Sequence, residues 1–332
     1  MPDAEIIPLP TIEDVKAAAG RIKGLCLETP LLESPYLNQQ LGGRLLVKAE
    51  NLQITGSFKL RGATNRIAML SEEEKRRGII ARSSGNHGLA VAYCAHLMET
   101  PAVVVIPDTA PATKAERIKA YGARVVQVPM SELAETAKQI EVREKLVYVA
   151  PADDFWVVAG AGTVGMEIAD QAAARGIKID AVLASCSGGG LAAGCLIGLG
   201  DTSPGTKVYA VEAAGSEKMA QSLAGGRRVN LQAPSSSICD AITGLYTAEI
   251  PFEIIRPRLA GTFAVTDEEV QQAMRAAFSE LGLAVEPGGA AALAAVLAGR
   301  MPVEGRTVVV VLSGRNVDLP LASSTLGRQQ RM

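Results

Sequence analysis

Short apolar runs alternate along this chain with longer segments whose apolar residues recur every three or four positions. The runs predict buried strands, and the longer segments predict helices. The predicted strands are Arg44–Lys48, Gly78–Ala81, Val103–Ile106, Val125–Val128, Leu146–Ala150, Ala181–Ala184, Lys207–Glu212, Phe263–Val265 and Val308–Leu312. Regular alternation of strand and helix is typical of parallel sheets with right-handed crossovers. We therefore expect an α/β fold.

Polar residues mark the start of two predicted helices. Thr11 and Thr266 each precede acidic residues and an apolar residue at helical spacing, which is typical of a capped helix start. Further helices are predicted at Ser71–Arg77, Leu89–Met98, Thr113–Tyr121, Ser131–Lys145, Thr163–Arg175 and Leu191–Ile197, and in the alanine-rich segment that Val285 opens.

A glycine-rich turn joins the strand ending at Ala184 to the helix after it. The turn reads Ser187-Gly188-Gly189-Gly190, and Leu191 follows. Three glycines let the backbone approach a ligand closely, and the helix N-terminus points free N–H groups and a positive dipole end at the same spot. The turn therefore predicts a phosphate-binding pocket, although a tight turn without a ligand has the same residues.

Two familiar kinds of phosphate ligand do not fit this turn. No Gly-Lys-Ser/Thr follows the glycines, so a nucleoside triphosphate is not expected. No strand leads into a Gly-x-Gly-x-x-Gly with a downstream acid, so a dinucleotide is not expected either. A compact cofactor with one phosphate remains. Pyridoxal 5′-phosphate is the obvious candidate, and it requires a lysine that forms a Schiff base.

Lys59 is one candidate for that lysine. It lies between Phe58 and Leu60 and close to Arg61. A lysine beside another cation and in apolar surroundings is expected to have a lowered pKa, which makes its amine a better nucleophile. From the local residues alone, a lysine on a helix surface is an equal alternative.

A second glycine-containing turn, Ser83-Ser84-Gly85-Asn86-His87-Gly88, joins another predicted strand to its helix. Its helix N-terminus is suited to a carboxylate, as the first turn is suited to a phosphate. Ser84 and Asn86 are the better placed residues for chemistry, and His87 is expected to fill the turn as a structural histidine.

Composition narrows the class of protein. The chain has 332 residues, of which 48% are hydrophobic, and a net charge of −2. This length allows a well-buried core in one large or two interleaved domains, and the charge argues against nucleic acid as a partner. No apolar run reaches membrane-spanning length. The five cysteines are scattered without a Cys-x-x-Cys pair, which favours a reducing cytoplasm and argues against a structural zinc site.

With these segments in place, the chain resembles the fold-type II, tryptophan synthase β-like pyridoxal-phosphate enzymes. It is most similar to their threonine/serine dehydratase and serine racemase branch. Five motifs carry the resemblance in the right order, and together they are highly specific. They are Gly56-Ser-Phe-Lys-Leu-Arg-Gly-Ala63, Ser83-Ser-Gly-Asn-His-Gly88, Ser187-Gly-Gly-Gly-Leu191, Val285-Glu-Pro287 and Leu312-Ser-Gly-Arg-Asn-Val-Asp318.

The resemblance implies an architecture of two three-layer αβα domains with mostly parallel, twisted sheets. Residues 1–68 and 155–332 would form a large pyridoxal-phosphate domain, and residues 69–154 a small mobile domain. A homodimer is expected, with a small hydroxy amino acid as the partner of the site and neither nucleic acid nor membrane.

The resemblance also implies roles for individual residues. Lys59 would carry the Schiff base, and backbone N–H groups of Gly188, Gly189, Gly190 and Leu191 would bind the phosphate. Asn86 would hydrogen-bond the ring hydroxyl of the cofactor, and Ser313 would meet its pyridine nitrogen. The substrate carboxylate would bind Ser83, Ser84, Gly85, Asn86 and His87. A serine leaves the pyridine nitrogen largely unprotonated, which favours loss of a β-substituent.

Three positions depart from the pattern of the relatives. Related enzymes often bind a divalent cation through an acid that Glu212 matches and a second acid six residues on, where this chain has Lys218. We therefore expect no metal. Gly160-Ala161-Gly162 stands where Gly-Gln-Gly is common. Arg315 stands in place of a glycine, and it is expected to pair with a surface acid or, as the alternative, to clamp a second substrate anion.

The leading hypothesis is an ammonia-lyase, or dehydratase, that converts a β-hydroxy amino acid such as L-threonine or L-serine into a 2-oxo acid and ammonium. One alternative is an amino-acid racemase with Lys59 on one face of the substrate and Ser84 on the other. Another is a dehydratase for a larger or anionic β-hydroxy amino acid. A non-catalytic binder of the cofactor is not favoured, because the residues for chemistry are all present.

Ser84→Ala is expected to suppress any racemisation much more than elimination, because only racemisation must reprotonate the opposite face of the substrate. Chiral analysis of unreacted amino acid, alongside an assay for oxo acid, measures both. Equal loss of the two activities would show that Ser84 serves the carboxylate or the loop instead.

Overall fold

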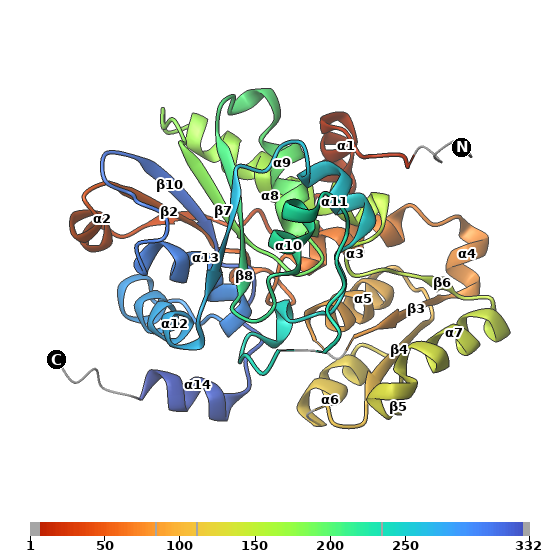
Figure 1. Cartoon of the computed structure of the whole chain (residues 1–332). Coiled ribbons are helices and arrows are strands. Elements are labelled where there is room, and N and C mark those ends of the chain that lie inside the picture. The colour runs from red at the N-terminus through yellow and green to blue at the C-terminus, as the bar shows by residue number, and fades with distance from the viewer. Residues whose placement is uncertain (1–6, 84, 111, 234, 328–332) are drawn as a thin grey trace.

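The structure, a computed structural model, describes residues 7–83, 85–110, 112–233 and 235–327 and contains two β-sheets (Figure 1). The six-stranded sheet has the order β1-β2-β10-β7-β8-β9, and the four-stranded sheet has the order β5-β4-β3-β6. The strands of the larger sheet are β1 (Leu31–Glu33), β2 (Arg44–Lys48), β7 (Ala181–Ser185), β8 (Lys207–Ala213), β9 (Gly261–Val265) and β10 (Thr307–Val311). Those of the smaller sheet are β3 (Ile79–Arg82), β4 (Ala102–Pro107), β5 (Arg124–Val128) and β6 (Val147–Tyr148).

All strand pairs are parallel except β1 with β2, which confirms the expected α/β fold with mostly parallel sheets. Each predicted strand is present, and its ends lie within two residues of the predicted ones. Strand β6 is shorter than predicted, since it has only two residues. The valine-rich runs predict strands well because β-branched residues fit a sheet that is buried on both faces.

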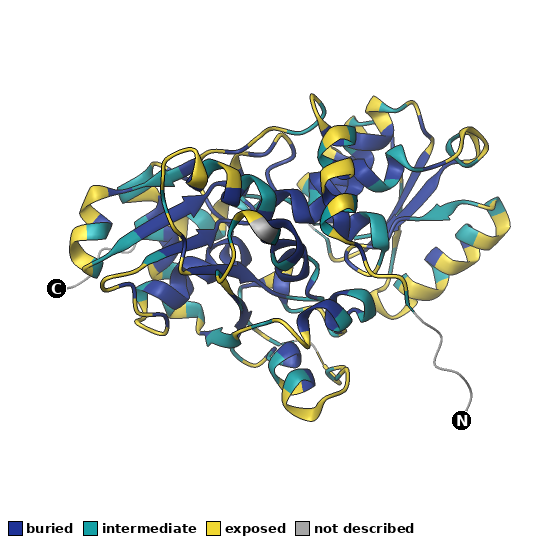
Figure 2. Cartoon of the chain, turned by 90° about the horizontal axis from the view of Figure 1, so that it is seen from above, coloured by how far each residue is buried: buried dark blue, intermediate teal, exposed yellow. Residues whose placement is uncertain are grey.

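Helices cover both faces of the larger sheet. On one face lie α2 (Pro35–Leu41), α12 (Asp267–Leu281) and α13 (Pro287–Leu297), and on the other lie α1 (Ile12–Ile22), α8 (Phe155–Ala173), α9 (Gly190–Leu199), α10 (Lys218–Gly225) and α11 (Glu249–Ile255). Alternate residues of β10 show the division, because Val308 belongs to the first core and Val309 to the second. Figure 2 shows the buried strands between helices whose outer faces are exposed.

The smaller sheet is a second three-layer unit. On one face lie α3 (Lys59–Ala68), α5 (Asn86–Leu97) and α6 (Ala112–Ala120), and on the other lies α7 (Leu133–Glu144). The short α4 (Glu72–Arg77) precedes β3, and α14 (Leu319–Leu326) ends the described chain. Helix α3 contacts both α5 and α8, so it joins the two units. Both expected three-layer αβα arrangements are therefore present.

The strands of the smaller sheet all lie between residues 79 and 148, and those of the larger sheet lie before 49 and after 180. This grouping agrees with the predicted division into a small domain and a discontinuous large one. The domain boundaries and the mobility of the small domain stay predictions.

The predicted start of α8 was wrong. The sequence analysis begins this helix at Thr163, but it begins at Phe155, where Asp154 accepts a hydrogen bond from the N–H of Val157. Gly160 and Gly162, which precede the predicted start, lie inside the helix. They permit close packing, since a Cβ on Gly160 would lie 2.6 Å from the carbonyl oxygen of Arg61.

Other helices were missed or misplaced at their ends. Helices α2, α10, α11 and α14 were not predicted. Glu217 and Ala248, which precede α10 and α11, are not typical capping residues, whereas Ser34 before α2 and Asp318 before α14 are start signals that the prediction did not use. Helix α5 begins at Asn86, three residues before the predicted start at Leu89. The capping boxes at Thr11 and Thr266 are confirmed, because each side chain accepts a hydrogen bond from the third helical residue.

Helices α8 and α9 contact each other through small residues. A Cβ on Gly198 of α9 would lie 1.9 Å from the carbonyl oxygen of Gly162 in α8. A Cβ on Gly165 of α8 would lie 2.7 Å from the carbonyl oxygen of Cys195. No side chain can occupy these positions unless the helices separate. The helix that carries the glycine turn is therefore held directly on α8 by backbone contact.

Gly198→Ala is expected to destabilise the protein by about 2 kcal/mol or more, because the new methyl group would force α8 and α9 apart. Gly20→Ala is the matched control. No atom lies within 4 Å of a Cβ built on Gly20, which is inside α1, so that change should stabilise by about 0.5 kcal/mol. Urea unfolding measures both, and equal effects would contradict the close packing.

Candidate active site

A cavity of about 900 Å³ lies between the two sheets and is lined by residues of both. Parallel sheets place ligands at the carboxyl ends of their strands, and β3, β7 and β10 each lead into this cavity. The predicted site residues that line it are Lys59, Ser83, Gly85, Asn86, His87, Gly188, Gly189, Gly190, Leu191 and Ser313. Ser84 lies outside the described residues. The sequence prediction therefore selected residues that the fold brings together.

Lys59 is the first residue of α3 and lies half-buried on the cavity wall. Its Nζ donates a hydrogen bond of 2.5 Å to the carbonyl oxygen of Pro151. Burial lowers the pKa of Lys59 to about 8, because the ammonium loses water there. The predicted direction is confirmed, and so is the predicted contribution of apolar surroundings, whereas the expected contribution of the Arg61 charge is absent.

Arg61 points away from the cavity into a buried ion network. Its guanidinium donates to both carboxylate oxygens of Glu50, at 2.8 and 2.7 Å, and to both of Glu167, at 2.5 and 2.8 Å. Lys48 adds a 2.6 Å bond to Glu167. Burial alone would raise the pKa of Glu50, but the charge and hydrogen bonds of Arg61 lower it. The network therefore neutralises Arg61 and fixes the helix turn that presents Lys59.

The glycine turn presents bare backbone to the cavity. Gly189 has φ +97°, a left-handed conformation that favours glycine, and its Cβ would lie 2.8 Å from the Met219 methyl carbon. A Cβ on Gly188 or Gly190 would lie 3.3 Å from Ala152. No side chain caps the start of α9, so its first N–H groups have no side-chain acceptor among the described residues. The turn has the donors and the space that a phosphate requires.

Ser185 adds a polar group at the base of this turn. It ends β7 and lines the cavity, and its buried Oγ has no hydrogen-bond partner within the described ranges. Buried hydroxyls rarely lack a partner, so this one supports a polar ligand at the turn. The residues present therefore fit a phosphate-bearing cofactor, by their open backbone and by this unpaired hydroxyl.

Asn86 is held between two other polar side chains. Its Nδ2 donates to Glu286 Oε1 at 2.5 Å, and its Oδ1 accepts from Asn316 Nδ2 at 2.5 Å. The amide has a second Nδ2 proton, which can meet a ligand in the cavity. Burial raises the pKa of Glu286 to about 7, although its bond to Asn86 opposes the rise. Glu286 and Asn316 lie in recognised motifs, but the sequence analysis gave them no role.

Ser313 lies at the end of β10 and is 6% exposed. Its carbonyl oxygen accepts from the N–H of Phe58, at 3.1 Å, beside Lys59. Gly289 packs against the backbone of Gly314, the residue after Ser313. A Cβ on Gly289 would lie 2.4 Å from the Gly314 carbonyl oxygen, so no side chain fits there. The strand end that carries Ser313 is thus tied to the helix start that carries Lys59.

His87 is buried at 3% exposure, and its Nε2 lies 2.8 Å from the carbonyl oxygen of Val149. A carbonyl can only accept, so Nε2 carries the proton. Burial and the charge of Lys59 lower the pKa of His87 to about 3, so the ring is neutral. This geometry agrees with the expected structural role of His87.

Lys218 and Glu212 are both fully buried. Glu212 accepts from the N–H groups of Met219 and Ala220, at 2.8 and 2.9 Å, at the start of α10. Lys218 Nζ lies 3.4 Å from the carbonyl oxygen of Ile242, in a loop that lines the cavity. In the part of the chain that the structure describes, no group of three or more His, Cys, Asp or Glu side chains could hold a metal. A buried lysine therefore occupies the position at which the resemblance predicts a second acid.

Arg315 does not line the main cavity. Its Nη1 donates a hydrogen bond to the carbonyl oxygen of Asn51. Among the described residues, no acid forms an ion pair with Arg315. The expected pairing with a surface acid is therefore wrong within the described residues, and the alternative role as a clamp for a second substrate anion stays a prediction. The carbonyl oxygen of Asn51 accepts the hydrogen bond of Arg315 in place of an acid.

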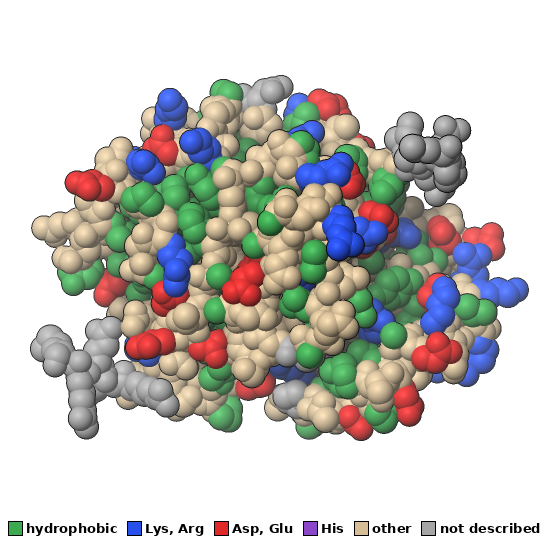
Figure 3. Space-filling view, viewed as in Figure 1, with side chains coloured by type: hydrophobic (Ala, Val, Ile, Leu, Met, Phe, Trp, Pro, Cys, Tyr) green, Lys and Arg blue, Asp and Glu red, His purple; other side chains and the backbone are tan. Residues whose placement is uncertain are grey.

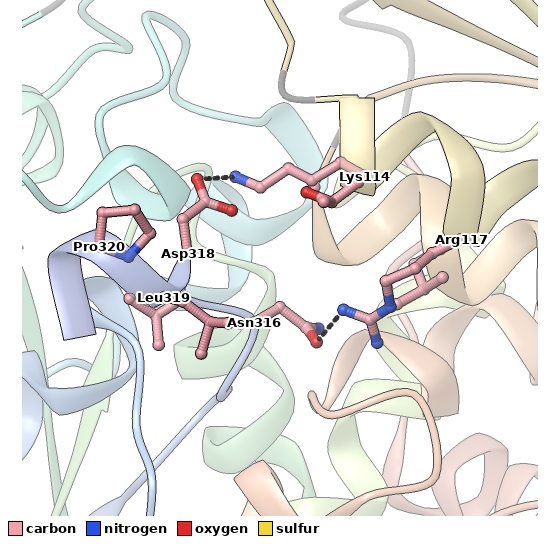
Figure 4. Close-up of a pocket in the computed structure, with 10 residues that line it drawn as sticks. Lys114, Arg117, Asn316, Asp318, Leu319 and Pro320 are labelled. Carbon is pink, nitrogen blue, oxygen red and sulfur yellow. Dashed lines mark hydrogen bonds and ion pairs between the residues drawn. The ribbon is translucent and has the colours of Figure 1, made fainter. Parts of the chain in front are cut away.

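A second cavity of about 590 Å³ adjoins the first (Figure 4). Figure 4 shows Lys114 directed at Asp318, 3.8 Å away, and Arg117 bonded to Asn316 at 3.1 Å. Gly85, Lys114 and Asn316 line both cavities. The side chain of Asn316 therefore contacts Asn86 of the main cavity and Arg117 of the second.

Arg82 and Tyr148 are among the cavity residues that the sequence analysis did not anticipate. Arg82 ends β3, directly before the predicted carboxylate loop, and Tyr148 lies on the neighbouring strand β6. Both line the main cavity, but nothing in their local sequence marks them, because their position depends on how β3 and β6 pair. Pairing between distant strands is a property that a single sequence does not display.

The surface carries both signs of charge. Figure 3 shows lysine and arginine interspersed with aspartate and glutamate on the visible face. None of the described helices has the length and apolar character needed to cross a membrane.

The chain is similar to known proteins over most of its length. Residues 22–314 match the family model described as pyridoxal-phosphate dependent enzyme. The crystal structure of a threonine deaminase from T.th. is 39% identical, with a TM-score of 0.88, and covers 93% of this chain and 99% of that one. A serine racemase from Dictyostelium discoideum is 34% identical, with a TM-score of 0.86, and covers 93% and 99%. The L-threo-3-hydroxyaspartate ammonia-lyase of Saccharomyces cerevisiae is 33% identical over 94% of each chain.

EDTA is expected to leave the activity and the melting temperature unchanged, and added Mg²⁺ is expected not to activate. Glu212 alone offers a poor site, since such ions require several oxygen ligands, and the Lys218 ammonium repels a cation. Lys218→Asp is the matched variant, in which we expect Mg²⁺ to raise the melting temperature. Inactivation of the unmodified enzyme by EDTA, reversed by Mg²⁺, would contradict the expectation.

Proposed function

The chain belongs to the pyridoxal-phosphate-dependent enzyme family, and we propose that it is an ammonia-lyase for β-hydroxy α-amino acids. Its cofactor is pyridoxal 5′-phosphate. The observation that carries the proposal is the convergence of Lys59, Asn86, the glycine turn and Ser313 on one cavity. The named activities of the threonine deaminase and the yeast ammonia-lyase support it.

Each of these groups has a separate task in the proposal. Lys59 holds the cofactor covalently, the N–H groups of Gly188 to Leu191 bind its phosphate, Asn86 meets its ring hydroxyl and Ser313 meets its ring nitrogen. When bound, the cofactor withdraws electrons from the substrate and makes the Cα–H bond acidic. Ser313 supplies a neutral hydroxyl and no carboxylate, which keeps this withdrawal moderate and favours loss of the β-hydroxyl.

Lys59 is suited to move the substrate's α-proton once its amine is free. With a pKa of about 8, roughly one amine in ten is neutral at pH 7, against about one in three thousand for an ordinary lysine. A neutral Nζ accepts the proton from Cα. The β-hydroxyl then leaves with a proton as water, and water later displaces the amine as ammonium, which gives a 2-oxo acid.

The loop from Ser83 to His87 is proposed to bind the α-carboxylate. Helix α5 begins at Asn86 without a side-chain cap among the described residues, so its N–H groups point free donors toward the cavity. The Oγ of Ser83 instead accepts from the N–H of Gly85 at 3.2 Å, which fixes the shape of the turn. Holding the carboxylate there positions the α-proton for Lys59.

Racemisation of the same substrate is the second candidate, favoured by the similarity to the Dictyostelium serine racemase. It requires a second acid–base group on the face opposite Lys59, and Ser84 is proposed for that role. The named substrates of the relatives differ in the side chain, with and without a second carboxylate. The choice of substrate therefore depends on the groups that line this chain's own cavity.

The assembly and location are also proposals. Leu27, Leu52 and Ile54 are exposed at 47%, 37% and 37%, and they lie close together because Gln53 hydrogen-bonds the backbone of Leu27. This apolar patch supports a homodimer. The five cysteines are free thiols, which supports a cytoplasmic location. Residues 69–154 are proposed to move as a small domain that closes the cavity.

Lys59→Ala is expected to lower turnover at least a thousandfold, because it removes both the covalent anchor and the base. It should also abolish the visible absorbance of the bound cofactor, which is an independent measurement. Lys119→Ala, on an exposed turn of α6, is the control and should change neither. An active Lys59→Ala protein that keeps its absorbance would show that another lysine holds the cofactor.

A further inference from the structure

Arg82 is a cation of the main cavity that the proposed reaction does not use. It is the last residue of β3 and lies half-buried on the cavity wall, next to the loop that starts at Ser83. No carboxylate of the described residues forms an ion pair with it. Partial burial of a guanidinium without a counter-ion lowers the stability of the folded protein, unless a ligand supplies the negative charge.

The strand pairing places Arg82 on a definite face of the smaller sheet. Ile80 is the register partner of Tyr148, and residues two apart in a strand share a face, so Arg82 and Tyr148 lie diagonally on the same side. Ile80 and Tyr148 pack with Leu133 of α7. Burial raises the pKa of Tyr148, and the charge of Arg82 opposes that rise, as expected for near neighbours.

The other cations of the cavity already have partners. Lys114 pairs with Asp240 at 3.4 Å, and Arg228 pairs with Glu249 at 2.6 Å. The acids of the wall are also occupied, since Asp153 accepts from the backbone N–H groups that begin α11, and Glu286 accepts from Asn86. Within the described residues, and with Lys59 assigned to the cofactor, Arg82 is thus the cation of the cavity wall that is available to bind an anion.

The position of Arg82 decides which anion this is. The phosphate cradle is on α9 of the larger unit, whereas Arg82 belongs to the smaller sheet, beside the proposed carboxylate loop. The α-carboxylate has the free N–H groups of α5 as its donors. A guanidinium adjacent to that loop matches a second carboxylate on the same substrate, which it can bind through two parallel hydrogen bonds.

We propose that Arg82 recognises a carboxylate on the substrate side chain, so that the preferred substrate is a β-hydroxy α-amino acid with a second acid, such as 3-hydroxyaspartate. This inference rests on the proposed ammonia-lyase function. Tyr148 offers a phenol O–H to the same carboxylate. The Met130 and Leu133 side chains line the cavity on this side.

The test compares 3-hydroxyaspartate with L-threonine as substrates of the holoenzyme. We expect a higher kcat/KM for 3-hydroxyaspartate in the unmodified enzyme. Arg82→Gln should lower the ratio of the two kcat/KM values at least tenfold, and Arg82→Lys should retain part of it. Arg228→Gln, which removes a cavity arginine already paired with an acid, should keep the ratio within a factor of two.

Ligand binding gives a readout that does not depend on turnover. Malonate should raise the melting temperature of the unmodified holoenzyme more than acetate does, and Arg82→Gln should remove this difference. Equal stabilisation by both acids, or an equal loss for both substrates in Arg82→Gln, would overturn the proposal and assign Arg82 to the shared α-carboxylate. If no hydroxy amino acid yields an oxo acid while the malonate difference persists, the lyase function fails and the anion site stands.

Discussion

The buried pairing of Arg61 with Glu50 and Glu167 is the interaction on which the site depends. Arg61 and Glu50 have no exposed surface, and the guanidinium makes two hydrogen bonds to each carboxylate. Loss of one partner would leave an uncompensated buried charge, which typically costs about 3–5 kcal/mol. The network joins the segment after β2, the first turn of α3 and the middle of α8. It therefore fixes the helix that carries Lys59, which packs on the smaller sheet, against the larger unit of the fold.

Small residues also hold the helices of the site in place, through close backbone packing. Glycines of α8 and α9 bring the two backbones into contact, and alanines of α13 are buried under the larger sheet. Such contacts leave little room for adjustment, since protein interiors are close-packed. The glycine turn at residues 188–190 leads into the N-terminus of α9, so the packing of α9 on α8 fixes the position of the turn. A rigid support of this kind favours a cradle that is formed before its ligand arrives.

The sequence predicted the strands and the members of the site better than it predicted their surroundings. Runs such as Val308–Leu312 fit a parallel sheet that is buried on both faces, and the glycine turns were interpreted as ligand loops together with the other motifs of the resemblance. The start of α8 could not be predicted, because Gly160 and Gly162 disfavour a helix unless a neighbour requires close approach. The direction of Arg61, and the presence of Arg82 and Tyr148 in the cavity, depend on contacts between residues far apart in the chain. Ser84 was assigned a role but lies outside the described residues, so that assignment stays a prediction.

The order of strands in the larger sheet also has a consequence for how the chain folds. Strand β2 lies between β1 and β10, and Arg44 is the register partner of Thr307. During synthesis the ribosome must therefore release the chain through β10 before the second edge of β2 is covered, whereas every strand of the smaller sheet is made between residues 79 and 148. Such non-local pairing slows folding and exposes an unpaired strand edge to aggregation in the meantime. Until β10 is synthesised, the chain thus has all strands of the smaller sheet but a β1–β2 pair with one open edge.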